Sequence, residues 1–278
     1  MDTIKTRAVR TSILIYLILS IGAFIMIVPF VWMVSTAFKT FQETLAIPIK
    51  WFPAKLQFDN FREVLNRLNF ARYYANTIFV TVSITLFQIL FCSMAAYGFA
   101  RIKFPGRGVL FIVLLSMLMI PQQMTLLPSY ILLSKLGWLD TFKALIIPNL
   151  FSVYGTFFLR QFFMSLPVEL EEAAIIDGSS RWGIFWRIFL PLSTTALAAF
   201  GIFTILWAWN DLMWPLIMTS RESIRVLSVG VATLVGQHST RNHWLMAAAM
   251  LATTPMIIMF IFLQKQFIAG ISITGLKA

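Results

Sequence analysis

The residues of this chain that could take part in chemistry form two groups. One is an acidic stretch within residues 169–177, in a segment that is amphipathic rather than continuously apolar. The other is a set of polar and aromatic residues in or beside long apolar runs: Gln122, Gln123, Tyr130, Trp209, Asn210 and Asp211. Surface acids suit charge-assisted hydrogen bonds to a partner, whereas polar groups within apolar runs mark sites that handle polar solutes.

Residue sets for catalysis or metal binding are missing from the sequence. It has no G-x4-G-K-[ST] phosphate loop, no metal-ligand cluster and no nucleophile–base set. Its two histidines, His238 and His243, lie in the last hydrophilic segment and are expected to be ordinary surface or interface residues. We therefore expect no catalytic residues, no bound cofactor and no metal site.

The composition indicates an integral membrane protein. Of 278 residues, 59% are hydrophobic and 12% are charged, and the mean hydropathy is +0.83; soluble domains are about 25% charged. This excludes a soluble enzyme, a disordered chain and a disulfide scaffold, the last also because Cys92 is the single cysteine. The net charge of +11 then indicates contact with lipid headgroups rather than with nucleic acid.

The apolar runs predict an all-α protein with six transmembrane helices in one domain, residues 1–278. A membrane-spanning helix needs about 20 apolar residues. The expected spans are residues 11–38, 75–100, 109–134, 143–160, 192–219 and 244–264. The first apolar run is much longer than the ~7–15 residues of a signal peptide, so we expect it to be retained.

Basic residues indicate the orientation. Lys and Arg are divided equally between the two sides, but Lys5, Arg7 and Arg10 precede the first span, and residues 101–108 contain three bases and no acid. Positive charge beside short loops favours the cytoplasmic side. Both termini are therefore expected in the cytoplasm. On the other side, residues 58–74 have the apolar spacing of an amphipathic helix that covers the bundle.

The segment 160–191 is predicted to form a helix-turn-helix at the membrane surface. Acids crowd the first half of its first helix, where the helix dipole favours them. Asp177-Gly178 offers a stop, and Ser179 or Ser180 can cap a second helix that begins at Arg181 and is ended by Pro191. The simplest interpretation is a hairpin that only connects two spans.

A specific residue pattern within this segment indicates more than a connecting hairpin. Glu172-Ala173-Ala174, three residues, Gly178, nine residues and Ile188-Phe189-Leu190-Pro191 resemble the EAA loop of permease subunits in binding-protein-dependent ABC importers. The resemblance implies a coupling helix that seats on a cytoplasmic ATPase. The residues it assigns to coupling are Glu172, Ala173, Ala174, Asp177, Gly178, Ile188, Leu190 and Pro191.

The resemblance covers nearly the whole chain and favours the carbohydrate branch of that family. Trp209-Asn210-Asp211 with Trp214-Pro215-Leu216 is similar to that branch's W-N-[DE]-F…P-L stretch, although Leu212 replaces the common aromatic residue. The short N-terminus resembles the smaller, maltose-type permease partner.

The resemblance also implies the assembly. It predicts two copies of an ATPase that hydrolyse ATP, a second permease in a heterodimer, an extracytoplasmic substrate-binding protein and a prokaryotic cell membrane. Residues 219–225 and 236–243 would meet the binding protein, and the tail after Gln264 would touch the ATPase. Gln122, Gln123, Tyr130, Trp209, Asn210 and Asp211 are the candidate translocation path.

Two alternatives remain open at the level of sequence. One is an ABC importer for another solute class, such as amino acids or peptides, against which the Trp209 region argues. The other is a polytopic membrane enzyme or sensor, which would need paired intramembrane acids or a soluble domain.

Overall fold

The computed structural model describes residues 2–235 and 241–275, and every regular element in these ranges is a helix. The elements in chain order are α1 (Asp2–Ala37), α2 (Phe41–Thr44), α3 (Asp59–Arg67), α4 (Phe70–Arg101), α5 (Arg107–Ser116), η1 (Met117–Met119), α6 (Gln122–Lys135), α7 (Phe142–Ile146), η2 (Ile147–Asn149), α8 (Val153–Ser165), α9 (Glu169–Ile176), α10 (Arg181–Ile184), η3 (Phe185–Phe189), α11 (Leu190–Leu192), α12 (Thr194–Asn210), α13 (Met213–Met218), η4 (Glu222–Ile224), α14 (Leu227–Ala232) and α15 (Asn242–Gly275). The all-α prediction is confirmed.

The chain divides into two compact units. The first combines Met1–Asn69 with Val231–Pro255, and the second combines Phe70–Gly230 with Met256–Ala278. That the whole chain acts as one membrane domain stays a prediction.

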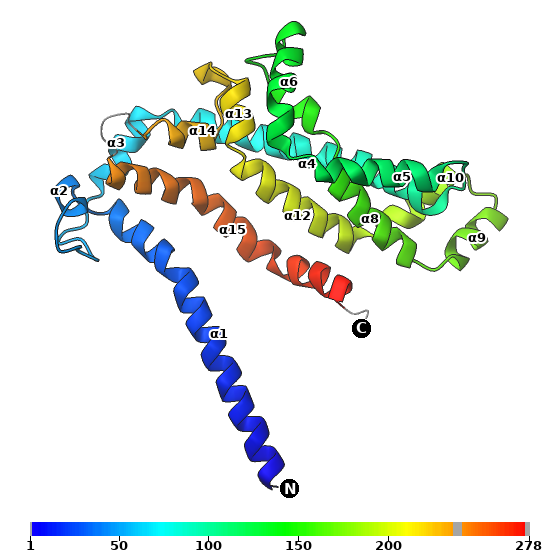
Figure 1. Ribbon diagram of the computed structural model, residues 1–278, viewed down its shortest axis with the longest axis horizontal. Coiled ribbons are helices and arrows are strands. Elements are labelled where there is room, and N and C mark those ends of the chain that lie inside the picture. Colours follow the sequence, from blue (N-terminus) through cyan, green and yellow to red (C-terminus); the bar gives the residue numbers. More distant parts are fainter. Residues whose placement is uncertain (1, 236–240, 276–278) are drawn as a thin grey trace. The chain divides into compact units, whose positions relative to one another are not determined.

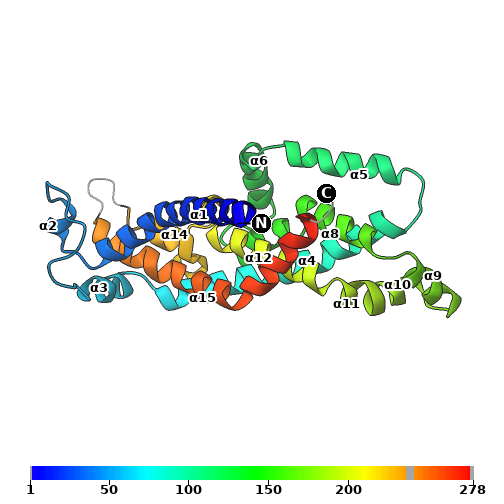
Figure 2. The ribbon, with the colours of Figure 1, turned by 90° about the horizontal axis from the view of Figure 1, so that it is seen from below.

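Within the described residues, four helical stretches are long and apolar enough to cross a membrane: Ser12–Ala37, Phe70–Arg101, Phe142–Ser165 and Asn242–Gln264. Two further stretches pass the same test only as bent pairs, Arg107–Met119 with Gln122–Lys135 at 96° and Arg181–Leu192 with Thr194–Asn210 at 76°. Counting each pair once gives six, as predicted. The third and fifth stretches, however, are broken rather than continuous; Figure 2 shows α5 and α6 meeting at the first break.

Proline explains both breaks. Pro121 disfavours helical geometry at the residue before it, and Ile120 is extended with ψ 114°. Pro191 has no N–H to donate one turn back, and the preceding turn widens into the π-helix η3 before the helix ends at Leu192. The second loop helix, expected to end at Leu190 before Pro191, therefore continues to Leu192, because the proline occupies the first turn of α11.

Three predicted boundaries also need correction. The amphipathic helix expected over 58–74 is two elements, because Leu68 is extended and ends α3. Asn69, a residue type that favours helix starts, precedes α4. The fifth span ends at Asn210 rather than at 219, since Pro215 could not donate in a continuous helix and the chain restarts as α13. At the fourth span, α8 continues to Ser165, so the connecting loop begins near Leu166.

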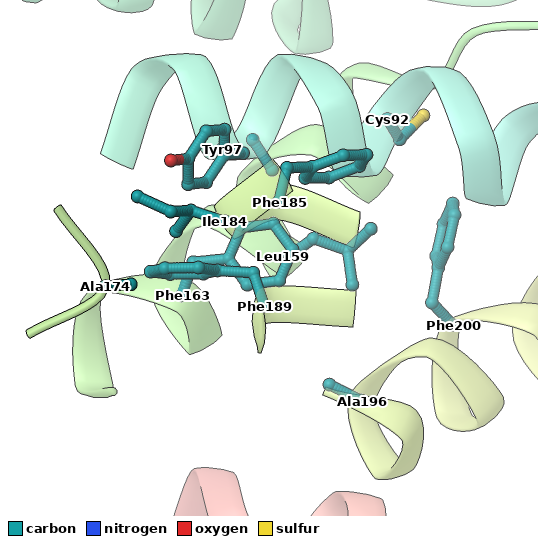
Figure 3. Packing of buried hydrophobic residues seen from close by; sticks show 11 residues of the cluster. Cys92, Tyr97, Leu159, Phe163, Ala174, Ile184, Phe185, Phe189, Ala196 and Phe200 are labelled. Carbon is teal, nitrogen blue, oxygen red and sulfur yellow. The ribbon is translucent and has the colours of Figure 1, made fainter. Parts of the chain in front are cut away.

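The second unit is built around α4, which packs against α8 and α12 (Figure 1). One core cluster surrounds Tyr97 of α4, with Leu159 and Phe163 from α8 and Phe185 and Phe189 from η3; Figure 3 shows these side chains converging. A second cluster lies along residues 80–84 of α4 and includes the buried Trp214 of α13. We call these the first and second core clusters.

In the first unit, polar contacts fix the end of α1. Asn60 of α3 donates from Nδ2 to the carbonyls of Ala37 and Lys39, at 2.8 Å each. The Lys39 ammonium lies 4.0 Å from the Trp32 ring centroid, and burial lowers the pKa of this amine. Glu43 accepts the backbone N–H groups of Thr40 and Ala54, both at 2.9 Å, so the loop after α1 is held by a single carboxylate.

Candidate functional site

The predicted helix-turn-helix is present and its turn has the expected chemistry. Gly178 takes the left-handed conformation, with φ 79°. Its N–H donates to Ile175 O at 3.0 Å, and the Ser179 N–H donates to Ala174 O at 2.9 Å, which closes the end of α9. Of the two candidate caps, Ser180 begins α10, because its hydroxyl accepts the Gly183 N–H at 3.1 Å.

The residues assigned to coupling divide between two environments. Glu172, Ala173, Asp177 and Gly178 are exposed. Ala174 is buried within the first core cluster, and Ile188 and Leu190 pack against the same cluster; Pro191 is exposed. The surface that α9 and its turn leave for a partner is therefore formed by the first four residues. Ile176, which is 85% exposed, enlarges that surface with an apolar side chain that sequence reasoning did not select.

A buried charge cluster anchors this loop, and sequence reasoning missed it. Glu171 pairs with Arg181 of α10 and, at 3.9 Å, with Arg101 at the end of α4. Arg101 also donates to the carbonyls of Phe163 at 2.7 Å and Leu166 at 2.5 Å, at the end of α8. The Arg101 and Glu171 side chains are only 7% and 8% exposed. The Arg101–Glu171–Arg181 cluster thus joins α4, α8, α9 and α10.

A cavity of about 440 Å³ with a mainly apolar lining lies among the helices of the second unit. Its lining residues are Gln88, Gln122, Asn149, Phe151, Ser152, Tyr154, Phe200, Phe203, Thr204 and Trp207. Of the predicted path residues, Gln122 is in this lining. Gln123 and Tyr130 lie on α6 with exposed side chains and are outside it.

Hydrogen bonds fix part of the cavity wall. Gln88 Nε2 donates to Asn149 O at 2.7 Å, and Thr204 Oγ1 donates to Gln88 Oε1 at 3.4 Å. Asn149 Nδ2 donates to Leu145 O at 2.9 Å. These contacts satisfy the amide groups of Gln88 and Asn149 within the chain and tie α4 to η2 and α12.

The other predicted path residues hold a turn instead. Trp209 and Asp211 line a separate cavity of about 10 Å³, which has room for about one water molecule. The Asp211 carboxylate accepts the Trp214 N–H at 3.4 Å, and the backbone carbonyl of Asp211 accepts the Ser228 hydroxyl at 2.6 Å. Asn210 donates to Leu206 O within its own helix. Asp211 therefore connects α12 to α13 and α14. None of the three residues lines the larger cavity, although the two cavities share Asn149 and Trp207 in their walls.

The segment 219–225, predicted to meet an external protein, is held by side chains of the second unit. Asn76 Nδ2 donates to Ser223 O at 3.0 Å and to Arg225 O at 2.8 Å. The Asp140 carboxylate accepts the N–H groups of Ser220 at 2.5 Å and Arg221 at 2.8 Å. Of the second predicted contact, 236–243, residues 236–240 lie outside the described part of the chain, as do residues 276–278 of the C-terminal tail.

The stability of the chain should depend on pH through the hydrogen bonds that the Asp140 carboxylate accepts from the Ser220 and Arg221 N–H groups. The backbone N–H groups of Arg221 and Ser220 lower the pKa of this carboxyl. Its stabilisation is therefore complete above the unfolded value of about 3.9 and is lost as the pH falls through the lower folded value. We expect wild type to exceed Asp140→Asn in melting temperature at pH 6 and this difference to shrink toward pH 3. A difference that stays constant or grows on acidification would contradict the assignment.

The membrane-length helices and the helix-turn-helix between α8 and α12 define an integral membrane protein with a surface helical hairpin. Residues 8–273 match the family model described as "Binding-protein-dependent transport system inner membrane component". The chain belongs to this family, as its EAA-like loop predicted.

Relatives match along almost their full length. The arabinooligosaccharides transport system permease protein AraQ of Halalkalibacterium halodurans is 34% identical over 96% of this chain and 99% of its own. The trehalose/maltose transport system permease protein MalG of Thermococcus litoralis is 33% identical, with the same coverage. The lactose transport system permease protein LacG of Rhizobium radiobacter is 29% identical over 97% of both chains.

Solved structures support the fold. A chain of a bacterial ABC transporter involved in import of the acidic polysaccharide alginate matches with a TM-score of 0.80, over 92% of this chain and 96% of that chain, at 22% identity. A second alginate transporter structure, with a periplasmic protein that carries an alginate pentasaccharide, matches with a TM-score of 0.65 and 17% identity over 92% and 94%.

Proposed function

We propose that this chain is the permease subunit of an ATP-driven importer for carbohydrates. The relatives that match over nearly their whole length are named for arabinooligosaccharides, trehalose and maltose, and lactose. The Trp209-Asn210-Asp211 stretch supports the same branch. An importer for amino acids or peptides is the alternative, and uptake assays with both solute classes separate the two.

The proposed assembly contains this chain, a second permease, two copies of a cytoplasmic ATPase and an extracytoplasmic substrate-binding protein. ATP would be bound and hydrolysed by the ATPase copies, and this chain would contribute no catalytic residue. Its place is a prokaryotic cell membrane with both termini in the cytoplasm, which the bases before α1 and in residues 101–108 support.

The observation that carries the proposal is the exposed face of α9 and its turn. Glu172 and Asp177 offer carboxylates for charge-assisted bonds, and Ala173 and Gly178 allow close approach by another backbone. The Arg101–Glu171–Arg181 cluster holds this surface against α4 and α8. Movement of a bound ATPase would therefore be transmitted to the transmembrane helices as rigid-body motion rather than absorbed by the loop.

A pair of matched substitutions tests this coupling role. Gly178 and Gly137 both end a helix in the left-handed conformation, with φ 79° and 66°, and both donate a 3.0 Å backbone bond to the preceding turn. Proline fixes φ near −65° and removes that donor at either position. We expect Gly178→Pro to lose co-purifying ATPase activity by about tenfold or more, because a single displaced interface helix costs above ~1.4 kcal/mol. Gly137→Pro should retain the ATPase.

The outcomes separate cleanly. If wild type yields a lone polypeptide without ATPase, the importer proposal is wrong. If both variants retain ATPase and coupled uptake, the 169–178 surface is not the coupling element. Equal loss in both variants would show that proline acts through general instability rather than through the loop.

A further inference from the structure

We propose that Arg107 and Arg160 together form a binding site for the phosphate headgroup of an anionic phospholipid. Arg107 begins α5 and Arg160 lies in the second half of α8, so the site belongs to the second unit. In the proposed orientation it faces the cytoplasmic leaflet. We call these two residues the arginine pair. The proposal concerns the lipid around the chain and does not depend on which solute the importer carries.

Aromatic packing holds the Arg160 guanidinium in place. The buried Phe111 ring of α5 lies 5.3 Å from the Phe99 ring of α4 and 6.4 Å from the Phe157 ring of α8, measured between ring centroids. The Arg160 guanidinium carbon lies 4.1 Å from the Phe111 ring centroid, and its Nε donates to the Phe99 carbonyl at 3.2 Å. The two terminal nitrogens of this guanidinium have no acceptor among the described residues, so their N–H groups are available to a ligand.

Arg107 brings a second positive charge to the same place. Its Nη1 donates to the Ile102 carbonyl at 3.2 Å, and its charge repels that of Arg160. Lys103, in the loop just before α5, is exposed and adds a third positive charge nearby. Like charges at close range disfavour one another, and an anion between them removes the repulsion. The arginine pair is therefore electrostatically incomplete without an anion.

The neighbouring elements contain no acid that could supply this anion. The sequences of α4, the loop after it, α5 and α8 include neither Asp nor Glu. Arg101, at the end of α4, has Glu171 as its partner, but the ion pairs within the described residues do not include either member of the arginine pair. Charges that are partly withdrawn from water are normally paired. Because the planar guanidinium fork matches phosphate oxygens, a phosphate group from outside the chain fits this site.

The surface beside the arginine pair identifies a lipid as the source of the phosphate. Along α5, large apolar side chains follow Arg107 and are exposed: Val109, Leu110, Ile112 and Val113. A soluble phosphate would use only the arginines and leave these side chains uncovered. A phospholipid supplies a phosphate for the arginines and acyl chains for α5 in one molecule. Basic pockets between membrane helices on the cytoplasmic side bind such headgroups.

Native mass spectrometry of the purified permease–ATPase complex tests the site. The complex would be titrated with phosphatidylglycerol, with zwitterionic phosphatidylcholine, and with phosphatidylglycerol in the presence of equimolar inorganic phosphate. We expect the wild-type complex to retain phosphatidylglycerol in preference to phosphatidylcholine. Inorganic phosphate should not displace it, because it lacks the acyl chains that contact α5.

Substitutions assign the retained lipid to the arginine pair. Arg107→Gln and Arg160→Gln should each weaken phosphatidylglycerol retention by about fivefold, the contribution of one basic residue at an anionic lipid surface. Arg107→Gln leaves the Arg160 contacts with Phe99 and Phe111 in place, so it tests the site without disturbing that packing. Arg160→Lys keeps the charge but not the fork and should recover part of the retention. Arg187→Gln is the matched control, because it removes the same charge from an exposed arginine of η3, outside the site.

Several results would overturn the proposal. Equal retention of the two lipids, or unchanged retention in both glutamine variants, would show that the arginine pair binds no anionic lipid. Equal weakening by Arg187→Gln would show that only the overall surface charge matters. Displacement by inorganic phosphate would assign the pair to a soluble anion, and loss of the ATPase or the second permease from the variants would assign it to a protein contact. The importer proposal is tested separately, by the ATPase that co-purifies with wild type.

Discussion

Replacing Arg101 with alanine should destabilise the chain by about 1–3 kcal/mol, the usual cost of leaving buried acceptors without their donor. Glu171 would keep only the Arg181 contact, and the Arg181 side chain is 54% exposed. The carbonyls of Phe163 and Leu166 would also lose their donor at the end of α8. Because these contacts fix α9 to α4 and α8, coupled uptake should fall together with stability.

Thermal and denaturant unfolding in mild detergent measure the first effect. Glu63→Ala is the control, because the Glu63–Arg67 pair on α3 is about half exposed and such pairs contribute less than about 1 kcal/mol. A loss below about 1 kcal/mol for Arg101→Ala would show that the cluster does not hold the loop.

A double substitution separates stability from coupling. Arg101→Met with Glu171→Met replaces the buried charges by apolar side chains, which restores much of the stability in comparable cases. We expect this variant to unfold at a higher temperature than Arg101→Ala. The complex that contains it should still hydrolyse ATP through its ATPase copies but with reduced uptake, because the directional contacts to α8 and α10 are gone. Full uptake by the double variant would mean that packing alone positions α9.

The membrane helices were predictable from sequence because length and apolar composition alone decide whether a helix can span a bilayer. The breaks at Pro121 and Ser193 were missed because an uninterrupted apolar run was taken as an uninterrupted helix. The different fates of Ala173 and Ala174 follow from helical geometry, since adjacent residues point about 100° apart. When Ala174 packs into the first core cluster, Ala173 is therefore left on the exposed side of α9.

The cavity was harder to foresee because its wall is assembled from distant parts of the chain. Gln88, Asn149 and Thr204 are separated by 61 and 55 positions, and only the packing of α4 against α8 and α12 brings them together. One signal was available: Gln88 is a lone amide within an expected span, and polar residues in such positions are usually functional. Glu171 gave no comparable signal, because its two arginine partners are recognisable only in the folded chain.

The second large effect is expected at Gly155, where α8 packs against Phe200 of α12. A Cβ on this residue would overlap the end of the Phe200 ring and lie 3.1 Å from its Cε1 atom. Phe200 is 2% exposed and belongs to the first core cluster, where Figure 3 shows it directed from α12 toward α4 near Cys92. Its ring packs against this cluster on one side and lines the cavity of about 440 Å³ on the other, so it can move only by giving up core contacts. Gly155→Ala should cost about 1–3 kcal/mol in unfolding free energy, as overpacking does in other cores.

The same substitution should also change the cavity of about 440 Å³, because Phe200 is part of its lining. Phe200→Leu should relieve the overlap, so Gly155→Ala should cost less in that background than in wild type. The unfolding free energies of wild type, the two single variants and the double variant then give the coupling free energy between the two positions. Gly98→Ala is the matched control. Gly98 is also a glycine inside a membrane-length helix, but a Cβ there meets nothing within 4 Å. The gain in helix propensity should therefore leave the unfolding free energy equal or higher by up to about 1 kcal/mol. Equal behaviour of the two alanine variants would show that α8 and α12 are not in close contact at Gly155.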